Sequence, residues 1–508
     1  MQNGISRRGL LAGTAALGAW AVAGMRPAFA DKATFAIPRD PIAPIPAGSS
    51  LRWVDSGDNK ARFYKAFMPQ YSDARGGAKI VYDGLPWDQI GTVVPLGIRN
   101  GTAQDVFSLP LSVSGAYAVA NGWVQPYDDF MPDLAAWKAG FPAGAFLEGL
   151  NVFGGKTYGL PYNSGRMSSA YTLYSVPLMQ EAGFDPAGKP LSWDDMRHAA
   201  LKITQAGKGQ RYGWIIGGSQ VNRWGAVVRS LAQASGAAGG GSGPWADLDF
   251  RTGEYLFDSD AYVGAIDLLL AMKTDRSVFP GVMGMNAPQA RAFIAQGAAG
   301  MILQGPWCVP QWQVQAPKFD FGSARTPAMN PAQGGATIVD AVASVNNTMW
   351  IWKGSKNQQL AADLFHYLGT VQGQTDWVNI VGPGDPPILP AAAKAAKISP
   401  RAQQVLELGE TSVRVGPNPL VRNPALAGVT AVFKAPTPGF SATVQGLFSG
   451  QLGNVKQAMT ELKSRMNAAL DTALAEAAKK GSKVSRDDLI FANWDPSRDY
   501  VQADYNAL

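Results

Sequence analysis

The sequence predicts an α/β fold with a mostly parallel sheet, divided among two or three domains. The chain has 508 residues, of which 46% are hydrophobic and 16% are charged, and a domain commonly contains ~100–200 residues. Its 15 Trp, 15 Tyr and 21 Phe residues supply enough apolar surface for large cores, which excludes disorder for most of the chain. Strand candidates also alternate with helix candidates between residues 51 and 109. This order is typical of helices layered on parallel strands.

The N-terminus has the three parts of an export signal. Residues 6–11 read Ser-Arg-Arg-Gly-Leu-Leu, residues 12–24 are weakly apolar, and Ala28-Phe29-Ala30 is a small-residue cleavage site. The Arg7-Arg8 pair resembles a twin-arginine signal, although an ordinary export signal with two arginines is the alternative. The apolar run is shorter than the ~18–20 residues of a membrane span. We therefore expect a signal peptide over residues 1–30 and a soluble periplasmic chain from Asp31 onward.

Charge and the scarcity of metal-binding residues exclude several classes of protein. The formal net charge is +6, and it falls to +3 when the first 30 residues with their three arginines are left out. A chain so close to neutral gives no reason to expect a nucleic-acid partner. The single cysteine, Cys308, excludes an internal disulfide, and two histidines, His198 and His366, are too few for a multi-histidine metal centre. We expect neither a cofactor nor a bound metal ion.

The first regular elements follow a proline-rich arm over residues 31–50, which we expect to be extended. A helix is expected from residue 62 to 68, because Pro69 should stop it. Residues 87–100 carry apolar residues at mixed spacing and end at Gly101. The strand candidates are residues 51–54, 79–82 and 105–109.

Helical signals are clearer in the rest of the chain. Ser192 followed by Asp195 is the signature of a capping box at the start of a helix. Residues 236–243 are rich in glycine but lack the Lys-Ser/Thr of a phosphate loop, so we expect a flexible linker there. The polar tail, residues 481–508, is expected to wrap around the fold or to be partly loose. Further apolar helices are expected over residues 261–272 and 360–368, and a long helix is expected from residue 455 to near Gly481.

No pattern of catalytic residues stands out, and we expect that the protein is not an enzyme. The chain lacks a Gly-x-Ser-x-Gly elbow, a His-Glu-x-x-His helix and a dinucleotide fingerprint. His198 and His366 lie in helix candidates, where structural or surface roles are expected. Neighbouring acids such as Asp194-Asp195 do not face one site, and the carboxylate separation of a glycosidase cannot be read from sequence. A secreted glycosidase or lyase is therefore the least favoured alternative.

Seven motifs follow one another between about residues 51 and 470. They are residues 76–81 (GGAKIV), 101–107 (GTAQDVF), 155–161 (GKTYGLP), 171–174 with 181–184 (YTLY and EAGF), 192–195 (SWDD), 293–307 (FIAQGAAGMILQGPW) and 355–368 (SKNQQLAADLFHYL). Each is short, but in this order they resemble the extracellular solute-binding proteins of ATP-driven importers, the family that contains maltose-binding protein. Gln104 stands where the family usually has Pro, and Gly300 interrupts the longest motif.

The resemblance implies a type II periplasmic binding protein fold, with two discontinuous α/β lobes joined by crossover strands. It places lobe 1 at residues 51–161 and 347–376 and lobe 2 at 166–341 and 378–480, with crossovers near 161–168, 340–348 and 374–384. It implies capture of a sugar, oligosaccharide or polyol by hinge closure, delivery to an inner-membrane ABC permease, and a monomer. The alternative is the same fold with a non-sugar cargo, either a glycerophosphodiester or a polyamine.

A sugar has apolar faces and polar rims, so its site needs flat aromatic rings together with carboxylates, amides or guanidinium groups. Trp307 is the first candidate, because the resemblance aligns Gly305-Pro306-Trp307 with a Gly-Pro-Trp whose Trp stacks on sugar; a core Trp is the alternative. Asp55, Asp58 and Asn59 follow the first strand candidate, where open α/β sheets place ligand contacts, and a helix-capping loop is the alternative. Ser108 also lies at the end of a strand candidate. Trp87 is a further candidate, with a place in the core as the alternative. The remaining candidates lie near the expected crossovers or precede a helix of lobe 2: Tyr162, Asn163, Arg166, Trp224 with Arg223, Trp377 and Asp385.

Overall fold

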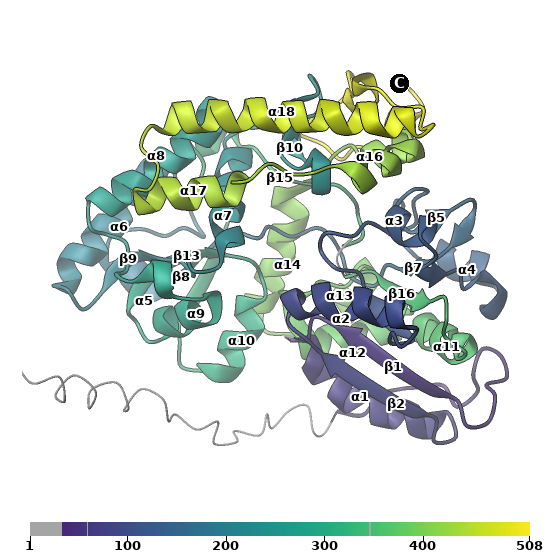
Figure 1. The fold of residues 1–508 in the computed structure, drawn as a ribbon. Coiled ribbons are helices and arrows are strands. Elements are labelled where there is room, and N and C mark those ends of the chain that lie inside the picture. The colour runs from purple at the N-terminus through teal and green to yellow at the C-terminus, as the bar shows by residue number, and fades with distance from the viewer. Residues whose placement is uncertain (1–32, 58, 345–346) are drawn as a thin grey trace, which may run out of the picture.

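The computed structural model describes residues 33–57, 59–344 and 347–508, which form two lobes that each have a sheet and covering helices (Figure 1). The fold is α/β, as expected. The predicted signal peptide, residues 1–30, lies outside the described residues. No helix in the described ranges combines the length and the apolar character that crossing a membrane requires.

The sheet of lobe 1 is parallel except for one of its described strands. Its order is β2-β1-β3-β16-β4, and β7 also pairs with β16. β1 is parallel to β2 and β3, whereas β16 runs antiparallel to β3, β4 and β7. The strands are β1 (Ser50–Asp55), β2 (Lys79–Gly84), β3 (Val106–Ser108), β4 (Val124–Gln125), β7 (Gly159–Leu160) and β16 (Met349–Trp352).

The sheet of lobe 2 repeats this plan with the order β14-β8-β13-β9. β13 is parallel to β9, and β8 runs antiparallel to both β13 and β14. In each lobe the reversed strand, β16 or β8, is the one whose chain has just arrived from the other lobe. The strands are β8 (Tyr171–Ser175), β9 (Tyr212–Ile215), β13 (Ala299–Gln304) and β14 (Phe321–Ala324).

Three chain segments lie side by side between the lobes. Ser164 bridges Ala343, and Asn163 bridges Pro387, both in antiparallel fashion. The Gly165 amide donates to the Val342 carbonyl at 2.7 Å, which adds to the same connection. Two of the expected crossovers therefore coincide with segments seen here, while the third lies near residue 387 and not within 374–384.

The third segment lies later because residues 371–381 form a helix of lobe 1. This helix packs against the first helix of the chain, and Trp377 is fully buried in the same core. The chain joins lobe 2 only at α14, which packs against β14. The helices of lobe 1 are α1 (Lys60–Ala74), α2 (Trp87–Asn100), α3 (Gly115–Ala120), α4 (Leu134–Ala139), α11 (Gln358–Leu368), α12 (Val371–Val381) and α13 (Pro390–Ala395).

Helix α1 continues through Pro69, where the sequence predicted its end. Proline removes one backbone hydrogen bond and costs ~3 kcal/mol inside a helix. Pro69 is exposed, however, and the residues on both sides of it, Phe67, Met68 and Tyr71, are buried in the core of lobe 1. Packing of this face outweighs the cost of the proline.

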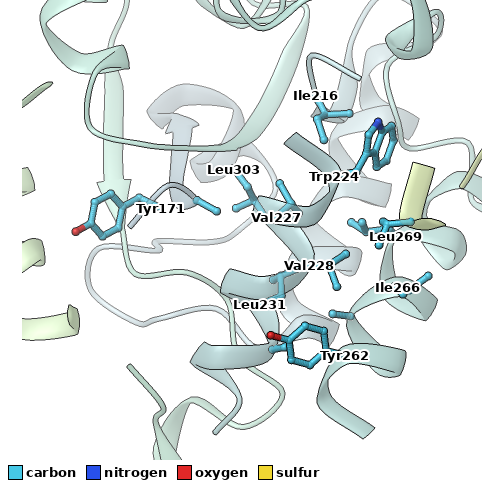
Figure 2. Packing of buried hydrophobic residues seen from close by; sticks show 14 of the residues in the cluster. Tyr171, Ile216, Trp224, Val227, Val228, Leu231, Tyr262, Ile266, Leu269 and Leu303 are labelled. Carbon is cyan, nitrogen blue, oxygen red and sulfur yellow. The ribbon is translucent and has the colours of Figure 1, made fainter. Parts of the chain in front are cut away.

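Lobe 2 holds most of the helices of the chain, and Figure 2 shows how α7 and α8 build its core. The expected capping box starts α6: the Asp195 amide donates to Ser192 Oγ at 2.9 Å, and the Ser192 amide donates back to Asp195 Oδ2 at 3.1 Å. The helices are α5 (Val176–Glu181), α6 (Trp193–Gly207), α7 (Val221–Ala234), α8 (Asp260–Thr274), α9 (Ala287–Ala295), α10 (Cys308–Gln315), α14 (Pro400–Ser412), α15 (Pro419–Arg422), α16 (Ala427–Val432), α17 (Phe440–Ser449), α18 (Val455–Lys479) and α19 (Gln502–Tyr505).

The glycine-rich segment 236–243 is not merely a linker. Gly239 and Gly240 form β10, which pairs with β11 (Leu248–Asp249), and β11 pairs with β12 (Glu254–Tyr255). A Cβ at Gly240 would lie 2.6 Å from Ile338 Cγ2, so the glycine allows close packing on β15. The remaining short strands are β5 (Val152–Phe153) with β6 (Lys156–Thr157), and β15 (Thr337–Val339) with β17 (Val413–Val415).

The described part of the proline-rich arm and the C-terminal extension both pack on the lobes. The arm, residues 33–49, has no helix or strand, as expected, and its Phe35 ring contacts Phe63 and Phe67 of α1. The C-terminal extension, residues 481–508, wraps around lobe 2 and buries Phe491 and Tyr500. The Phe491 amide donates to the Phe250 carbonyl at 2.6 Å.

Candidate functional site

The carboxyl ends of the two sheets meet between the lobes. Asn59 follows β1 in lobe 1, and its Nδ2 donates to the carbonyl of Trp307, which follows β13 in lobe 2, at 3.3 Å. A Cβ at Gly384 would lie 2.9 Å from Asn59 Nδ2 and 3.2 Å from Trp307 Cα, so the segment leading to the third crossing lies at the same point. We call residues 55–57, 59–60, 162–163, 304–308, 347 and 384–385 the interlobe site.

Asp55 is a fully buried carboxylate at the end of β1. Its Oδ1 accepts hydrogen bonds from the Gly57 amide at 3.0 Å and from the Tyr82 hydroxyl at 2.7 Å. Its Oδ2 is buried and has no hydrogen-bond partner among the described residues. Since a buried carboxylate oxygen is costly to leave unpaired, Asp55 has capacity for one more donor.

A polar chain links lobe 1 to the crossovers. Lys60 is buried in the first turn of α1, and its Nζ donates to Asn347 Oδ1 at 2.9 Å. Asn347 Nδ2 in turn donates to Asp385 Oδ1 at 3.1 Å. The Lys60 ammonium also lies 5.6 Å from the centre of the Trp87 ring, a cation–π distance. This chain ties the first helix to two of the three segments that connect the lobes.

The first crossover contributes Tyr162 and Asn163, which are both buried. Burial raises the pKa of Tyr162, and the nearby Tyr64 and Asp55 raise it further, so its hydroxyl stays protonated. Asn163 Nδ2 donates to the Asp385 carbonyl at 3.3 Å, while its Oδ1 has no partner among the described residues. Tyr162 therefore adds a hydroxyl group near Asp55, and Asn163 adds an acceptor beside Asp385.

Lobe 2 contributes an aromatic ring and a group of polar side chains. Trp307 is partly exposed, and its Nε1 donates to Gln304 Oε1 at 3.4 Å. Cys308 Sγ lies 3.2 Å from the same oxygen. The guanidinium carbon of Arg223, in the first turn of α7, lies 5.5 Å from the centre of the Trp307 ring. The ring is thus held on one side and partly open.

The other candidates lie in different surroundings. Trp224 and Trp377 are fully buried core residues, whose Nε1 groups donate to the carbonyls of Gly218 and Asp385 (Figure 2 shows Trp224 among apolar side chains of lobe 2). Ser108 is buried, and its Oγ lies 3.2 Å from Met349 Sδ. Arg166 pairs with Asp499 of the C-terminal extension. Asp58 lies outside the described residues.

A second contact between the lobes lies beside α3. It encloses a cavity of about 560 Å³ between α2 and α3 of lobe 1 and α16 of lobe 2. Tyr117 and Trp123 line it, with ring centres 5.5 Å apart. Two cavities of about 600 and 660 Å³ lie instead at Gln296 and Gly297, which precede β13 and so lie at the edge of the sheet away from Trp307.

Sequence reasoning missed several polar residues of the site. Lys60 directly follows Asn59, so the run of polar residues after β1 could have indicated it. Gln304 closes a strand of otherwise apolar or small residues, which is a comparable signal. Asn347 and Arg291 have no local signal, since only the tertiary fold places them near the other lobe or near Arg223.

The chain matches the family model described as bacterial extracellular solute-binding protein over residues 55–375. Over 322 residues it is 25% identical to a binding protein of Brucella abortus strain 2308, which covers 62% of this chain and 69% of that protein. A solute-binding protein of Thermotoga lettingae bound to α-D-tagatose is similar in structure, with a TM-score of 0.61 and 19% identity over 83% of this chain and 100% of that one. The maltotriose-binding protein of Thermus thermophilus gives a TM-score of 0.59 and 19% identity, with the same two coverages. With more than half of its length matched by the family model, the chain belongs to the bacterial extracellular solute-binding proteins.

Proposed function

We propose that the protein is the periplasmic substrate-binding component of an ABC importer, and that it captures a carbohydrate between its lobes. The observation that carries this proposal is the contact between Trp307 of lobe 2 and Asn59 of lobe 1, which follows the same strand end as Asp55. An aromatic ring and a set of carboxylate and amide groups are what the apolar faces and hydroxyl rims of a sugar require. Similar structures carry such ligands: tagatose, maltotriose and raffinose are bound by proteins of the same fold.

The proposed roles follow from the contacts. Trp307 stacks on a sugar face, and Asp55 Oδ2 accepts a hydrogen bond from a hydroxyl group. Asn163 and Tyr162, on the first crossover, contact the ligand from the base of the site. Because side chains of both lobes contact the ligand at the same time, binding favours the closed arrangement of the lobes. A membrane permease then recognises this closed arrangement.

The cellular location of the protein is also part of the proposal. The Ser-Arg-Arg-Gly-Leu-Leu sequence of residues 6–11 directs export through the twin-arginine route, and the exported monomer remains in the periplasm. Replacing Arg7 and Arg8 with Lys should leave the protein in the cytoplasmic fraction of the producing cell. Unchanged periplasmic recovery would contradict twin-arginine export, and recovery with the membranes would contradict a soluble product.

The test of carbohydrate capture is the melting temperature of the purified protein against mono- and oligosaccharides, polyols, glycerophosphodiesters and polyamines. A ligand at ~100 times its Kd stabilises the folded state by ~2.7 kcal/mol, which raises the Tm by several degrees. Trp307→Ala should weaken binding by ~10- to 150-fold, because ~1.5–3 kcal/mol of apolar burial is lost. Trp352→Ala is the matched control, since Trp352 is also partly buried but pairs with Val124 at the far end of β16.

A shift with carbohydrates that is lost in Trp307→Ala and kept in Trp352→Ala supports the proposal. A shift with polyamines alone overturns the carbohydrate assignment. Prolonged incubation followed by chromatography should return the ligand unchanged, and any cleaved product would favour the glycosidase or lyase alternative.

A further inference from the structure

Two arginines of lobe 2 lack acidic partners among the described residues: Arg223, which lies beside Trp307, and Arg291, which neighbours Arg223. Arg291, on α9, is only 7% exposed, and Arg223, on α7, is partly buried. Among the residues that the structure describes, no carboxylate forms an ion pair with either one. Burial lowers the pKa of Arg223, the neighbouring Cys308 raises it, and the neighbouring Arg291 lowers it.

Arg75 and Arg229, in contrast, each bind a carboxylate. Arg75 Nε donates to Asp363 at 2.6 Å. Arg229 donates through two of its guanidinium nitrogens to the two carboxylate oxygens of Asp247, at 2.5 and 2.6 Å. A buried cation without a counter-charge costs several kcal/mol. Arg223 and Arg291 therefore stand out as a positively charged pair that no carboxylate of the described residues neutralises.

The polar groups around this pair are hydrogen-bond donors. Arg291 Nε is buried without an acceptor, and so is Gln304 Nε2. The acceptor of Gln304 is already used, because its Oε1 receives Trp307 Nε1 and faces Cys308 Sγ. The unpaired hydrogen-bond donors at this edge of lobe 2 would therefore suit a negatively charged acceptor.

We propose that the captured carbohydrate carries an acidic group, a carboxylate or a phosphate, which Arg223 and Arg291 receive beside Trp307. Arginine forks bind planar carboxylates and phosphates in bidentate fashion, and they do so most strongly where water is excluded. The inference rests on the proposed function, since it assumes that the ligand enters the interlobe site. A cationic polyamine would be repelled by the same pair.

The test compares acidic and neutral sugars of the same skeleton by calorimetric titration of the wild-type protein. The pairs are galacturonate oligomers against galactose oligomers, and glucose 6-phosphate against glucose. In at least one pair the acidic member should bind at least ~10-fold more tightly, and the difference should shrink as NaCl is raised. The pair with the larger difference identifies carboxylate or phosphate as the recognised group.

Variants separate recognition from folding. Arg223→Gln should remove the preference for the acidic sugar, and Arg223→Lys, which keeps the charge but loses the fork, should restore part of it. The matched control is Arg211→Gln, which removes the same charge just before β9, at the edge of the sheet away from Trp307. The Tm of each variant without ligand checks that it is folded.

The outcomes distinguish this inference from the proposed function. Equal binding of acidic and neutral sugars overturns the inference and leaves carbohydrate capture standing. Binding of a glycerophosphodiester with no response to any sugar overturns carbohydrate capture and supports recognition of an acidic group. If the wild-type protein binds acidic sugars more tightly and Arg223→Gln keeps the same preference, the assignment of these arginines is overturned.

Discussion

At the scale of single residues, the buried pair of Arg75 and Asp363 fastens three parts of lobe 1. The two side chains are 2% and 1% exposed, and their atoms lie 2.6 Å apart. The Asp363 carboxylate also accepts from the Tyr71 hydroxyl and, at 2.8 Å, from the Ile42 amide of the arm. One carboxylate on α11 thereby fixes both α1 and the N-terminal arm.

Replacing Asp363 with Asn should therefore be strongly destabilising. The change leaves the Arg75 cation buried without a counter-charge, and breaking a buried pair in this way costs ~3–5 kcal/mol. Urea denaturation measures the loss in the free energy of unfolding. The control is Asp320→Asn, which breaks an exposed pair with Arg401 and should cost less than ~1 kcal/mol. Equal losses in the two variants would contradict this account.

At the scale of elements, α6 and α8 are clamped by an ion pair. Arg197 donates to both carboxylate oxygens of Asp275 at 2.6 and 3.0 Å. The hydrogen bond from Arg197 lowers the pKa of Asp275 below its usual value. A carboxyl group with a lowered folded-state pKa adds stability above its unfolded pKa of ~3.9, and this stability is lost as the pH falls through the folded-state value.

The pH dependence of this clamp can be measured with Arg197→Gln. At pH 7 the variant should melt below the wild-type protein, by a difference worth ~1 kcal/mol or less because Arg197 is half exposed. At pH 3 the difference should be smaller, since Asp275 begins to be protonated in both proteins. A difference that stays the same between pH 7 and pH 3 would show that the carboxylate charge does not matter.

Elements were predictable where local chemistry decides them. The Ser192–Asp195 box starts α6 because both partners lie within one turn. The prediction that Pro69 ends the first helix was wrong, because the burial of Phe67 and Tyr71 keeps α1 helical beyond the proline. A local sequence pattern does not reveal that burial. The strand at Gly239–Gly240 was missed for a similar reason, since its partner β11 and the close approach of Ile338 come from the tertiary fold.

At the scale of the whole molecule, the C-terminal extension is part of lobe 2. Its Phe491 is fully buried against Phe250, with ring centres 5.6 Å apart. Its Asp499 binds Arg166, which directly follows the first crossover, at 2.5 Å. The extension therefore stabilises lobe 2 and also anchors one of the segments on which the lobes would turn.

Phe491→Ala should lower the free energy of unfolding by ~3–5 kcal/mol, because it leaves a cavity in a packed core. Thermal or urea unfolding of the full chain measures it. Phe293→Ala is the control, since Phe293 is 37% exposed and its loss should cost ~1 kcal/mol. A small effect at Phe491 would mean that the extension is only loosely attached.

In the candidate site, too, residues placed by local structure could be predicted from the sequence, whereas residues placed by tertiary packing could not. Asp55 and Asn59 could be named from sequence because the ends of parallel strands share one edge of a sheet. Arg166 and Trp377 were named for their nearness to crossovers, but whether such a residue faces ligand, core or another segment is decided by packing across more than a hundred residues. Arg166 binds the extension and Trp377 lies in the core of lobe 1.

The most direct test of the central claim, capture between closing lobes, is the distance between the lobes with and without ligand. Spin labels placed by Gln89→Cys on α2 and Asn222→Cys on α7, both exposed positions, report it by pulsed electron paramagnetic resonance, while Cys308 is buried. We predict that a carbohydrate that raises the Tm shortens and narrows the distance distribution. An unchanged distribution with the same ligand at saturation would contradict capture by closure.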